Sequence, residues 1–502
     1  MGKPSDCAID MSPEDFRALG HKLVDRIADF LGEIPDRPAG ASWTPESVRA
    51  LLGGAGLPEE GSDAGALLDR ATDMMFEKWR LNGHPRSWGY VIGTPAPIGM
   101  LGDFLAASIN HNVPAWGSAP IAAEIESQVI RWVAELLGYP TDCGGLLTSG
   151  GNMANFVGFM TARRTLAERH GWDVRVDGVA AGKQLCAYTS VETHTWVQKA
   201  ADLSGIGTDA IRWISTDDHQ RMDLAVLEAR IAEDRAAGHI PFIVIGSAGT
   251  VSTGAVDPLP RLAEIAKAEA MWFHVDGAYG GLAAASDESP DDIQGLRLAD
   301  SLAVDAHKWM FAPLEAGIAL VRDRKAQFST FSYRPPYYNF TTHSNEETIN
   351  YHEYGPQNSR QFRALKVWLV LSQLGRQGYT EILGRNIRQS REMHQAMAAE
   401  PETEAHTQNL SIATFRFVPG DLAPDDGGPV DDYLDRLNND LVIRIQQGGE
   451  AYISQAVVHG RFLLRACITN FRTASADVRA LPEIVRRLGV ELDKEIRPKQ
   501  LG

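Results

Sequence analysis

The chain has 502 residues, 44% of them hydrophobic and 23% charged, which is the composition of a globular protein long enough to bury a large core. Its formal net charge of −17 argues against nucleic acid or an anionic membrane surface as the main partner. No uncharged apolar run approaches the length of a membrane span, and the N-terminus lacks the features of a signal peptide. We therefore expect a cytoplasmic protein.

Cysteine and histidine spacing gives no sign of a metal centre. The four cysteines, which lie far apart and include no CxxC pair, are Cys7, Cys143, Cys186 and Cys467. No HExxH motif or paired Cys/His spacing occurs. We expect reduced, buried thiols and no metal site.

The first 85 residues predict a helical arm. Ser12 is a suitable N-cap, Pro13 follows it at the first helical position, and apolar residues recur at helical spacing up to residue 33. Gly/Pro-rich stretches interrupt the pattern before a second helix near 64–80. Such a segment has too little apolar surface for a core of its own, so we expect it to pack on a neighbouring domain or subunit.

Residues 119–325 alternate between short apolar runs and amphipathic helices, which indicates an α/β domain with a mostly parallel sheet. The expected strands are 144–148, 185–188, 242–245, 271–275, 301–304 and 317–321. The expected helices are 121–137, 153–169, 192–203, 223–237 and 258–269.

Residues 331–356 are polar and aromatic without a clear period, which is typical of a lid or a disordered segment. A long helix is expected from about 359 to 398, and the remainder mixes strands with helices. The predicted organisation is an N-terminal arm (1–85), a large α/β domain (86–375) and a small C-terminal α+β domain (376–502).

Two of the apolar runs end at residues whose pairing suits one kind of cofactor chemistry. Residues 301–304 lead to Lys308, and residues 271–275 lead to Asp276. A lysine can hold the aldehyde of pyridoxal phosphate as an imine, while a carboxylate keeps the pyridine nitrogen protonated so that the ring accepts electrons. Either residue alone is more often a solvated strand end or a turn cap. The small Ala278 after Asp276 favours the functional interpretation, because a flat ring could lie close to the backbone.

The turn 149–152 joins a predicted strand to a helix and contains Gly150 and Gly151. Free backbone N–H groups at a helix N-terminus suit a phosphate, although a tight connection alone would also explain the glycines. The turn is neither GxGxxG nor a P-loop, and a monophosphate cofactor would explain why neither nucleotide fingerprint is present. His194 follows another predicted strand on the same rim, where an imidazole could stack on a cofactor ring; a single histidine is more often a core or surface residue.

These motifs occur in an order that resembles the group II pyridoxal-phosphate decarboxylases, and among them the aromatic-L-amino-acid decarboxylases. The resemblance extends from His84 to about Arg472 and implies the fold type I of pyridoxal-phosphate-dependent transferases. The ordered set is Ser149-Gly150-Gly151-Asn152-Met153-Ala154-Asn155, Glu192-Thr193-His194, Gly249-Thr250, His274-Val275-Asp276-Gly277-Ala278-Tyr279 and His307-Lys308-Trp309.

The resemblance implies a role for each matching residue. Lys308 forms the internal aldimine, and Asp276 pairs with the pyridine nitrogen. His194 stacks on one face of the ring, Ala278 packs on the other, and Thr250 is a hydrogen-bond partner on the cofactor side.

The phosphate is implied to bind at Gly150, Gly151 and Asn152, with help near Asp305 and His307. Here the chain departs from the animal aromatic decarboxylases, which have Asn-Pro before His-Lys where this chain has Asp305 and Ala306. An acid beside a phosphate is unfavourable unless it points away or is hydrogen-bonded.

Tyr337 matches the mobile-loop tyrosine that reprotonates the carbanion after CO2 leaves, with Tyr338 beside it. This gives segment 331–356 the role of a lid. A phenylalanine at the loop position would favour oxidative aldehyde formation, so the tyrosine favours plain decarboxylation.

Trp88, Tyr90 and Trp116 lie in segments that resemble the family's pocket walls, and three aromatics suit an aromatic side chain. Core or dimer-interface positions would explain them equally well. We expect decarboxylation of an aromatic L-amino acid to the amine and CO2, by a homodimer whose arm is swapped onto the partner. The alternatives are an aldehyde synthase, a decarboxylase of acidic amino acids, and a cofactor-binding protein without turnover.

Overall fold

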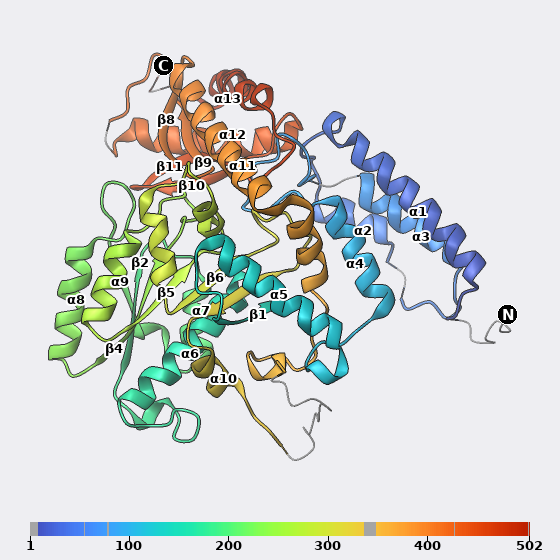
Figure 1. Cartoon of the computed structure of the whole chain (residues 1–502). Helices are drawn as coiled ribbons and strands as arrows, with labels where there is room; N and C mark the ends of the chain where they lie inside the picture. Colours follow the sequence, from blue (N-terminus) through green and yellow to red (C-terminus); the bar gives the residue numbers. More distant parts are fainter. Residues whose placement is uncertain are drawn as a thin grey trace.

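The computed structural model describes residues 9–54, 56–77, 80–335, 348–425, 427–499 and 501. Its centre is a seven-stranded sheet with the order β1-β7-β6-β5-β4-β2-β3 (Figure 1). Strand β7 runs antiparallel to its neighbours β1 and β6, and the other neighbouring pairs are parallel. The strands are β1 (Gly144–Thr148), β2 (Leu185–Ser190), β3 (Ile211–Ile214), β4 (Ile240–Ser247), β5 (Trp272–Asp276), β6 (Ser301–Asp305) and β7 (Gly317–Val321).

The sheet is covered on both faces. Every residue of β1, β2, β4, β5, β6 and β7 is buried, so these strands read as continuous apolar runs rather than alternating ones. The predicted mostly parallel α/β domain is therefore confirmed. The helices of this part are α5 (Pro120–Leu137), α6 (Gly151–Arg169), α7 (Trp196–Leu203), α8 (Leu224–Ala236), α9 (Leu259–Ala268) and α10 (Arg324–Phe331).

A second, smaller core lies around an antiparallel sheet with the order β10-β11-β9-β8. Helix α11 (Ala364–Ala399) contacts both parts of the molecule, and its backbone leaves the helical conformation at Gly375, where φ is +65°. The other elements are β8 (Thr403–Asn409), β9 (Ile412–Phe417), α12 (Pro429–Gly448), β10 (Ser454–Val458), β11 (Arg461–Cys467) and α13 (Ser475–Ile496).

The N-terminal helices are α1 (Pro13–Glu33), α2 (Pro45–Leu52), α3 (Ala64–Glu77) and α4 (Pro97–Ile109). Helices α1 and α3 lie side by side and project from the rest of the chain (Figure 1), joined by stacked rings of Phe30 and Phe76 with centroids 4.2 Å apart. The expected cap is present, because Ser12 Oγ accepts a hydrogen bond from Asp15 N at 3.0 Å. No residue of α1 is buried, which agrees with an arm that lacks a core of its own.

Segment 331–356 is described only in part. Residues Tyr351–Glu353 form a short 3-10 helix (η7) whose three residues are all buried, so this end of the segment is packed, not structureless as expected. Tyr337 and Tyr338 lie outside the described residues. Among the described helices, none is both long and apolar enough to cross a membrane.

Asp257 is a fully buried carboxylate that joins two parts of the large domain. Its Oδ1 accepts from Met222 N at 2.7 Å and its Oδ2 accepts from Ser247 N at 2.8 Å, at the end of β4. Burial raises the pKa of Asp257 to about 6, against these hydrogen bonds, which lower it.

Replacing Asp257 with asparagine is expected to remove a pH dependence of stability. The folded-state pKa of about 6 lies above the usual value of 3.8, so the protonated carboxyl of Asp257 favours the folded state. This contribution to the free energy of unfolding is fully present below pH 3.8 and is lost as the pH rises through about 6. Relative to Asp257→Asn, the wild-type free energy of unfolding should fall by about 3 kcal/mol across this window. Urea unfolding of both proteins at several pH values measures the difference, and parallel pH profiles would contradict it.

Candidate active site

A cavity of about 160 Å³ lies where the parallel strands β2, β4, β5 and β6 end, at the edge of the sheet where α/β proteins bind ligands. The sequence-predicted residues that line it are Gly151, Asn152, His194, Thr250, Asp276, Ala278, Asp305 and Lys308. Four further lining residues belong to the ordered motif set but were given no role, namely Asn155, Glu192, Gly249 and Tyr279, and the lining residues outside that set are Trp196, Ser247 and Val251.

Lys308 lies in the turn after β6, where its backbone N donates to Asp305 O at 3.1 Å. Its Nζ is 3.1 Å from Asp305 Oδ2, and its side chain is 22% exposed toward the cavity. Gly93 packs against this turn so closely that a Cβ there would lie 1.8 Å from Lys308 O. The segment around Gly93 therefore fixes the lysine backbone, and only glycine permits the approach.

Asp276 ends β5 with both carboxylate oxygens hydrogen-bonded. Trp196 Nε1 donates to Oδ2 at 2.7 Å, and Ala278 N donates to Oδ1 at 3.1 Å. These donors orient the carboxylate at the cavity wall. The sequence did not reveal Trp196, because an indole at the start of a helix is ordinarily a packing residue.

A buried polar network behind Asp276 holds β5 against β6 and α6. His274 Nδ1 lies 2.7 Å from Ser301 Oγ, and His274 Nε2 lies 2.7 Å from Asn155 Oδ1. Burial lowers the pKa of His274 to about 4, so the imidazole is neutral near pH 7. The amide oxygen of Asn155 can only accept, which assigns the proton to Nε2.

The N-terminus of α6 faces the same cavity. No side chain caps this helix, so its first N–H groups remain available to an anion. A Cβ at Gly151 would lie 2.7 Å from Asp305 Oδ2 and 2.8 Å from the Ala278 Cβ. The glycine thus brings the helix end directly against the ends of β5 and β6.

His194 and Thr250 line the cavity from the loops after β2 and β4. Trp196 N donates to His194 Nδ1 at 3.3 Å, and burial lowers the pKa of His194, which favours the neutral imidazole. Thr250 Oγ1 lies 3.1 Å from Thr253 Oγ1.

Two predicted residues, Gly150 and His307, pack beside the cavity without lining it. A Cβ at Gly150 would lie 3.3 Å from His307 Cε1. His307 Nδ1 accepts from Ala316 N at 3.1 Å, its Nε2 is 3.7 Å from Asp305 Oδ2, and burial lowers its pKa.

The three predicted substrate aromatics do not gather at this cavity. Trp88 has no exposed surface and donates from Nε1 to Thr473 Oγ1 at 3.1 Å within the smaller core, so its prediction as a pocket wall is wrong. Tyr90 is half exposed beneath the Arg80 guanidinium, 4.5 Å from the ring centroid. Trp116 hydrogen-bonds through Nε1 to a surface glutamate. For Tyr90 and Trp116 a substrate contact stays a prediction.

Arg465 is a buried cation that the sequence did not single out. Its Nη2 donates to Gly89 O at 2.6 Å and its Nη1 donates to Val251 O, whereas its Nε has no partner. No carboxylate among the described residues pairs with it, and burial lowers its pKa. The guanidinium ties β11 both to the segment that carries Tyr90 and to the cavity wall.

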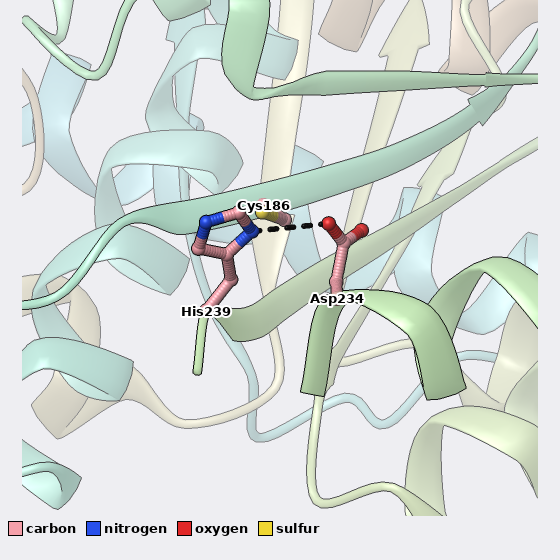
Figure 2. A group of neighbouring side chains, drawn as sticks. All are labelled: Cys186, Asp234 and His239. Atoms are coloured by element: carbon pink, nitrogen blue, oxygen red, sulfur yellow. Dashed lines mark hydrogen bonds and ion pairs between the residues drawn. The ribbon is translucent and has the colours of Figure 1, made fainter. Parts of the chain in front are cut away.

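Cys186, Asp234 and His239 are the group of potential metal ligands among the described residues (Figure 2). Nitrogen Nη2 of Arg212 lies 3.1 Å from Cys186 Sγ and 2.8 Å from Asp234 Oδ1. Tyr188 OH also donates to Asp234, at 2.8 Å. The Arg212 guanidinium therefore occupies the space between the three potential ligands. We interpret the cluster as a salt bridge between Arg212 and Asp234.

The lining residues of the cavity fit pyridoxal phosphate. They offer an amine, a carboxylate oriented by two hydrogen-bond donors, a neutral imidazole and an uncapped helix N-terminus, which match an aldehyde, a pyridinium, a ring face and a phosphate. With the topology of the sheet, this set defines a pyridoxal phosphate enzyme.

The family described as pyridoxal-dependent decarboxylase conserved domain matches residues 45–417, and the chain belongs to this family. It is therefore a pyridoxal-phosphate-dependent carboxy-lyase. The chain is 32% identical to an aromatic-L-amino-acid decarboxylase of Bacillus atrophaeus, over 96% of this chain and 97% of that protein. It is 28% identical to a phenylacetaldehyde synthase of Arabidopsis thaliana, over 95% and 96%. The crystal structure of Oryza sativa TDC with PLP and tryptamine superposes with a TM-score of 0.88 at 26% identity, over 96% of this chain and 99% of that one.

Trp196→Phe is expected to weaken cofactor binding about ten- to a hundredfold, since a hydrogen bond to a charged group contributes about 1.5–3 kcal/mol. Absorbance titration of the apoenzyme with pyridoxal phosphate measures the dissociation constant. The matched control is Trp213→Phe on the edge strand β3, whose indole is 41% exposed and which should bind like wild type. Wild-type affinity in Trp196→Phe would contradict the role given to this hydrogen bond.

Proposed function

We propose that the enzyme decarboxylates an aromatic L-amino acid to the corresponding amine and CO2. The observation that carries this proposal is the single cavity that Lys308, Asp276, His194 and the N-terminus of α6 share. The family supplies the reaction class, and the similarity to an aromatic-L-amino-acid decarboxylase supports the substrate class.

Pyridoxal phosphate, when bound, accepts the electrons of the breaking Cα–carboxylate bond into its ring. In the proposed site Lys308 is the residue that would hold the cofactor covalently through its amine. Asp276, oriented by Trp196 and Ala278, holds a proton on the pyridine nitrogen. His194 packs on one ring face and Ala278 on the other.

The phosphate is proposed to bind the turn at Gly150, Gly151 and Asn152, with His307 beside it, and Thr250 is proposed to hydrogen-bond on the cofactor side. Tyr337, outside the described residues, is the proposed acid that delivers a proton to Cα. The resemblance that supports this role also makes segment 331–356 the proposed lid.

Charge at the cavity argues against an acidic substrate. Its described lining includes three carboxylates, Glu192, Asp276 and Asp305, and one cation, Lys308, which the cofactor engages. Once the cofactor engages Lys308, the described lining offers no cation to a second substrate carboxylate, which favours an uncharged side chain. Tyr90 and Trp116 remain the proposed aromatic contacts.

A panel of the twenty amino acids assayed for CO2 release should give turnover with one or more of tryptophan, tyrosine and phenylalanine and none with glutamate. Lys308→Ala should abolish release, since no other lining residue carries an amine. Glutamate as the best substrate would contradict the substrate class. A protein that binds pyridoxal phosphate but releases no CO2 from any amino acid would contradict turnover itself.

Tyr337→Phe is expected to divert the reaction from amine toward aldehyde, ammonia and hydrogen peroxide, with O2 as the oxidant, because the acid that protonates Cα is lost. Chromatography of the products together with a peroxide assay measures the ratio of aldehyde to amine. The neighbouring Tyr338→Phe is the matched control and should leave amine as the main product. Aldehyde as the main wild-type product would instead favour a phenylacetaldehyde synthase-like activity, as in the Arabidopsis relative.

We also propose a homodimer in which residues 1–85 pack on the partner, with 86–375 and 376–502 as the large and small domains. Helix α4 exposes an apolar stripe at helical spacing, formed by Leu101, Phe104, Leu105 and Ile109, each about half exposed. Arm and stripe together offer the apolar surface that a stable dimer buries.

The three described cysteines, all buried free thiols, support a reducing compartment, and we propose the cytoplasm.

Phe104→Glu is expected to shift the protein from dimer to monomer, because a charge in the middle of the apolar stripe would have to be desolvated. Sedimentation velocity measures the assembly state. The matched control is Leu298→Glu, an apolar residue of equal 51% exposure outside the stripe, which should leave the dimer intact. A monomeric wild-type protein would contradict the proposed assembly.

A further inference from the structure

Asp305 is a buried carboxylate at the proposed phosphate site, and one of its oxygens lacks a partner. Its side chain is 3% exposed, and Oδ1 has no hydrogen-bond partner. Its Oδ2 is 3.1 Å from Lys308 Nζ. Both oxygens lie against the uncapped start of α6, since a Cβ would lie 2.7 Å from Oδ2 at Gly151 and 3.9 Å from Oδ1 at Gly150.

The charges around Asp305 change when the cofactor loads. In the free chain its neighbours are the Lys308 ammonium and the imidazoles of His307 and His194, which burial keeps neutral by lowering their pKa values. Asp276, at the end of β5, is held by its own donors, and α6 contributes backbone N–H groups. Imine formation with the cofactor would consume the Lys308 ammonium beside Asp305, and the proposed binding mode would bring a phosphate to the same helix end.

Two acceptors would then face each other in a buried place. A carboxylate and a phosphate dianion both lack a proton to share, so Oδ1 would stay unsatisfied in a buried site. A carboxylic acid removes the conflict, because its O–H can donate to a phosphate oxygen.

We propose that Asp305 takes the proton that Lys308 releases when the cofactor loads, and then binds the phosphate as a neutral carboxylic acid. An N–H bond of the Lys308 ammonium breaks, an O–H bond of Asp305 forms, and the freed electron pair of Nζ attacks the aldehyde carbon; the condensation expels water. The 3.1 Å separation of Nζ and Oδ2 is a hydrogen-bond distance suited to direct proton transfer.

This inference rests on the proposed phosphate site. It assigns to Asp305 a use that asparagine at the same position would lack: asparagine can donate to a phosphate but has no basic oxygen to take up the proton of the lysine.

Infrared difference spectra of wild-type holoenzyme minus apoenzyme test the proposal, with pyridoxal phosphate as the probe. We expect the C=O stretch of one additional protonated carboxyl, shifted by D2O, and its loss in Asp305→Asn. Asp305→Glu should retain a carboxyl band at a displaced frequency. Absence of the band in wild type, or its persistence in Asp305→Asn, would overturn the proposal; should the variants fail to fold, the presence or absence of the wild-type band decides.

Loading kinetics give a second readout. Stopped-flow absorbance at neutral pH should show slower condensation of pyridoxal phosphate in Asp305→Asn, by tenfold or more, with recovery as pH rises and solvent takes the lysine proton. An equal rate and pH profile in both proteins would overturn the base role. A wild-type protein that fails to load the cofactor at all would refute the proposed site itself, which separates the two failures.

Discussion

The active site depends on one constraint, which is that parallel strands end at the same edge of a sheet. Asp276 lies at that edge as the last residue of β5, and the loops after β2, β4 and β6 bring His194, Thr250 and Lys308 to it from distant parts of the sequence. Helix α6 begins after β1, which is separated from β6 by the antiparallel β7. At Gly317 of β7 a Cβ would lie 2.4 Å from the Gly150 carbonyl carbon, so a glycine lets the helix start cross to β6.

Hydrogen bonds around the buried polar groups determine how this edge can act. Asp276 is fixed by Trp196 and Ala278, and the neutral His274 behind it is fixed by Ser301 and Asn155. A carboxylate whose two oxygens are both hydrogen-bonded keeps its position. Asp305 differs because one of its oxygens is unsatisfied, and an unsatisfied buried acceptor within a site marks the place where a ligand group completes the network.

Much of the fold could be predicted because its strands are short apolar runs bounded by glycines and amphipathic helices. The expected run at 271–275 is observed at Trp272–Asp276, and that at 317–321 is observed unchanged. The edge strand β3 was not predicted, because the charged Arg212 interrupts its four-residue apolar run. Helix α4 was also not predicted, because its stripe of exposed apolar residues does not resemble the polar face of a surface helix.

The site was predictable where a residue acts by its own chemistry, as Lys308 and Asp276 do. It was not predictable where a residue acts through a neighbour that only folding supplies. Trp196 matters because it reaches Asp276 from another loop, and Gly93 matters because it passes over the lysine turn. Trp88 illustrates the opposite case, since its motif context matched a pocket wall while its indole lies in the smaller core.

The unusual acid at position 305 gains its meaning from this same distinction. Considered from the sequence alone, an aspartate beside a phosphate site is unfavourable, because two anions repel each other. Within the fold it lies 3.1 Å from the one amine that must lose a proton before it can act as a nucleophile. The transfer of one proton from Lys308 to Asp305 therefore has two effects. It removes the repulsion between the carboxylate and the phosphate, and it frees the lysine amine to act as a nucleophile. A basic residue at this position would attract the phosphate but leave the lysine charged, so an acid meets both requirements where a cation would meet only one.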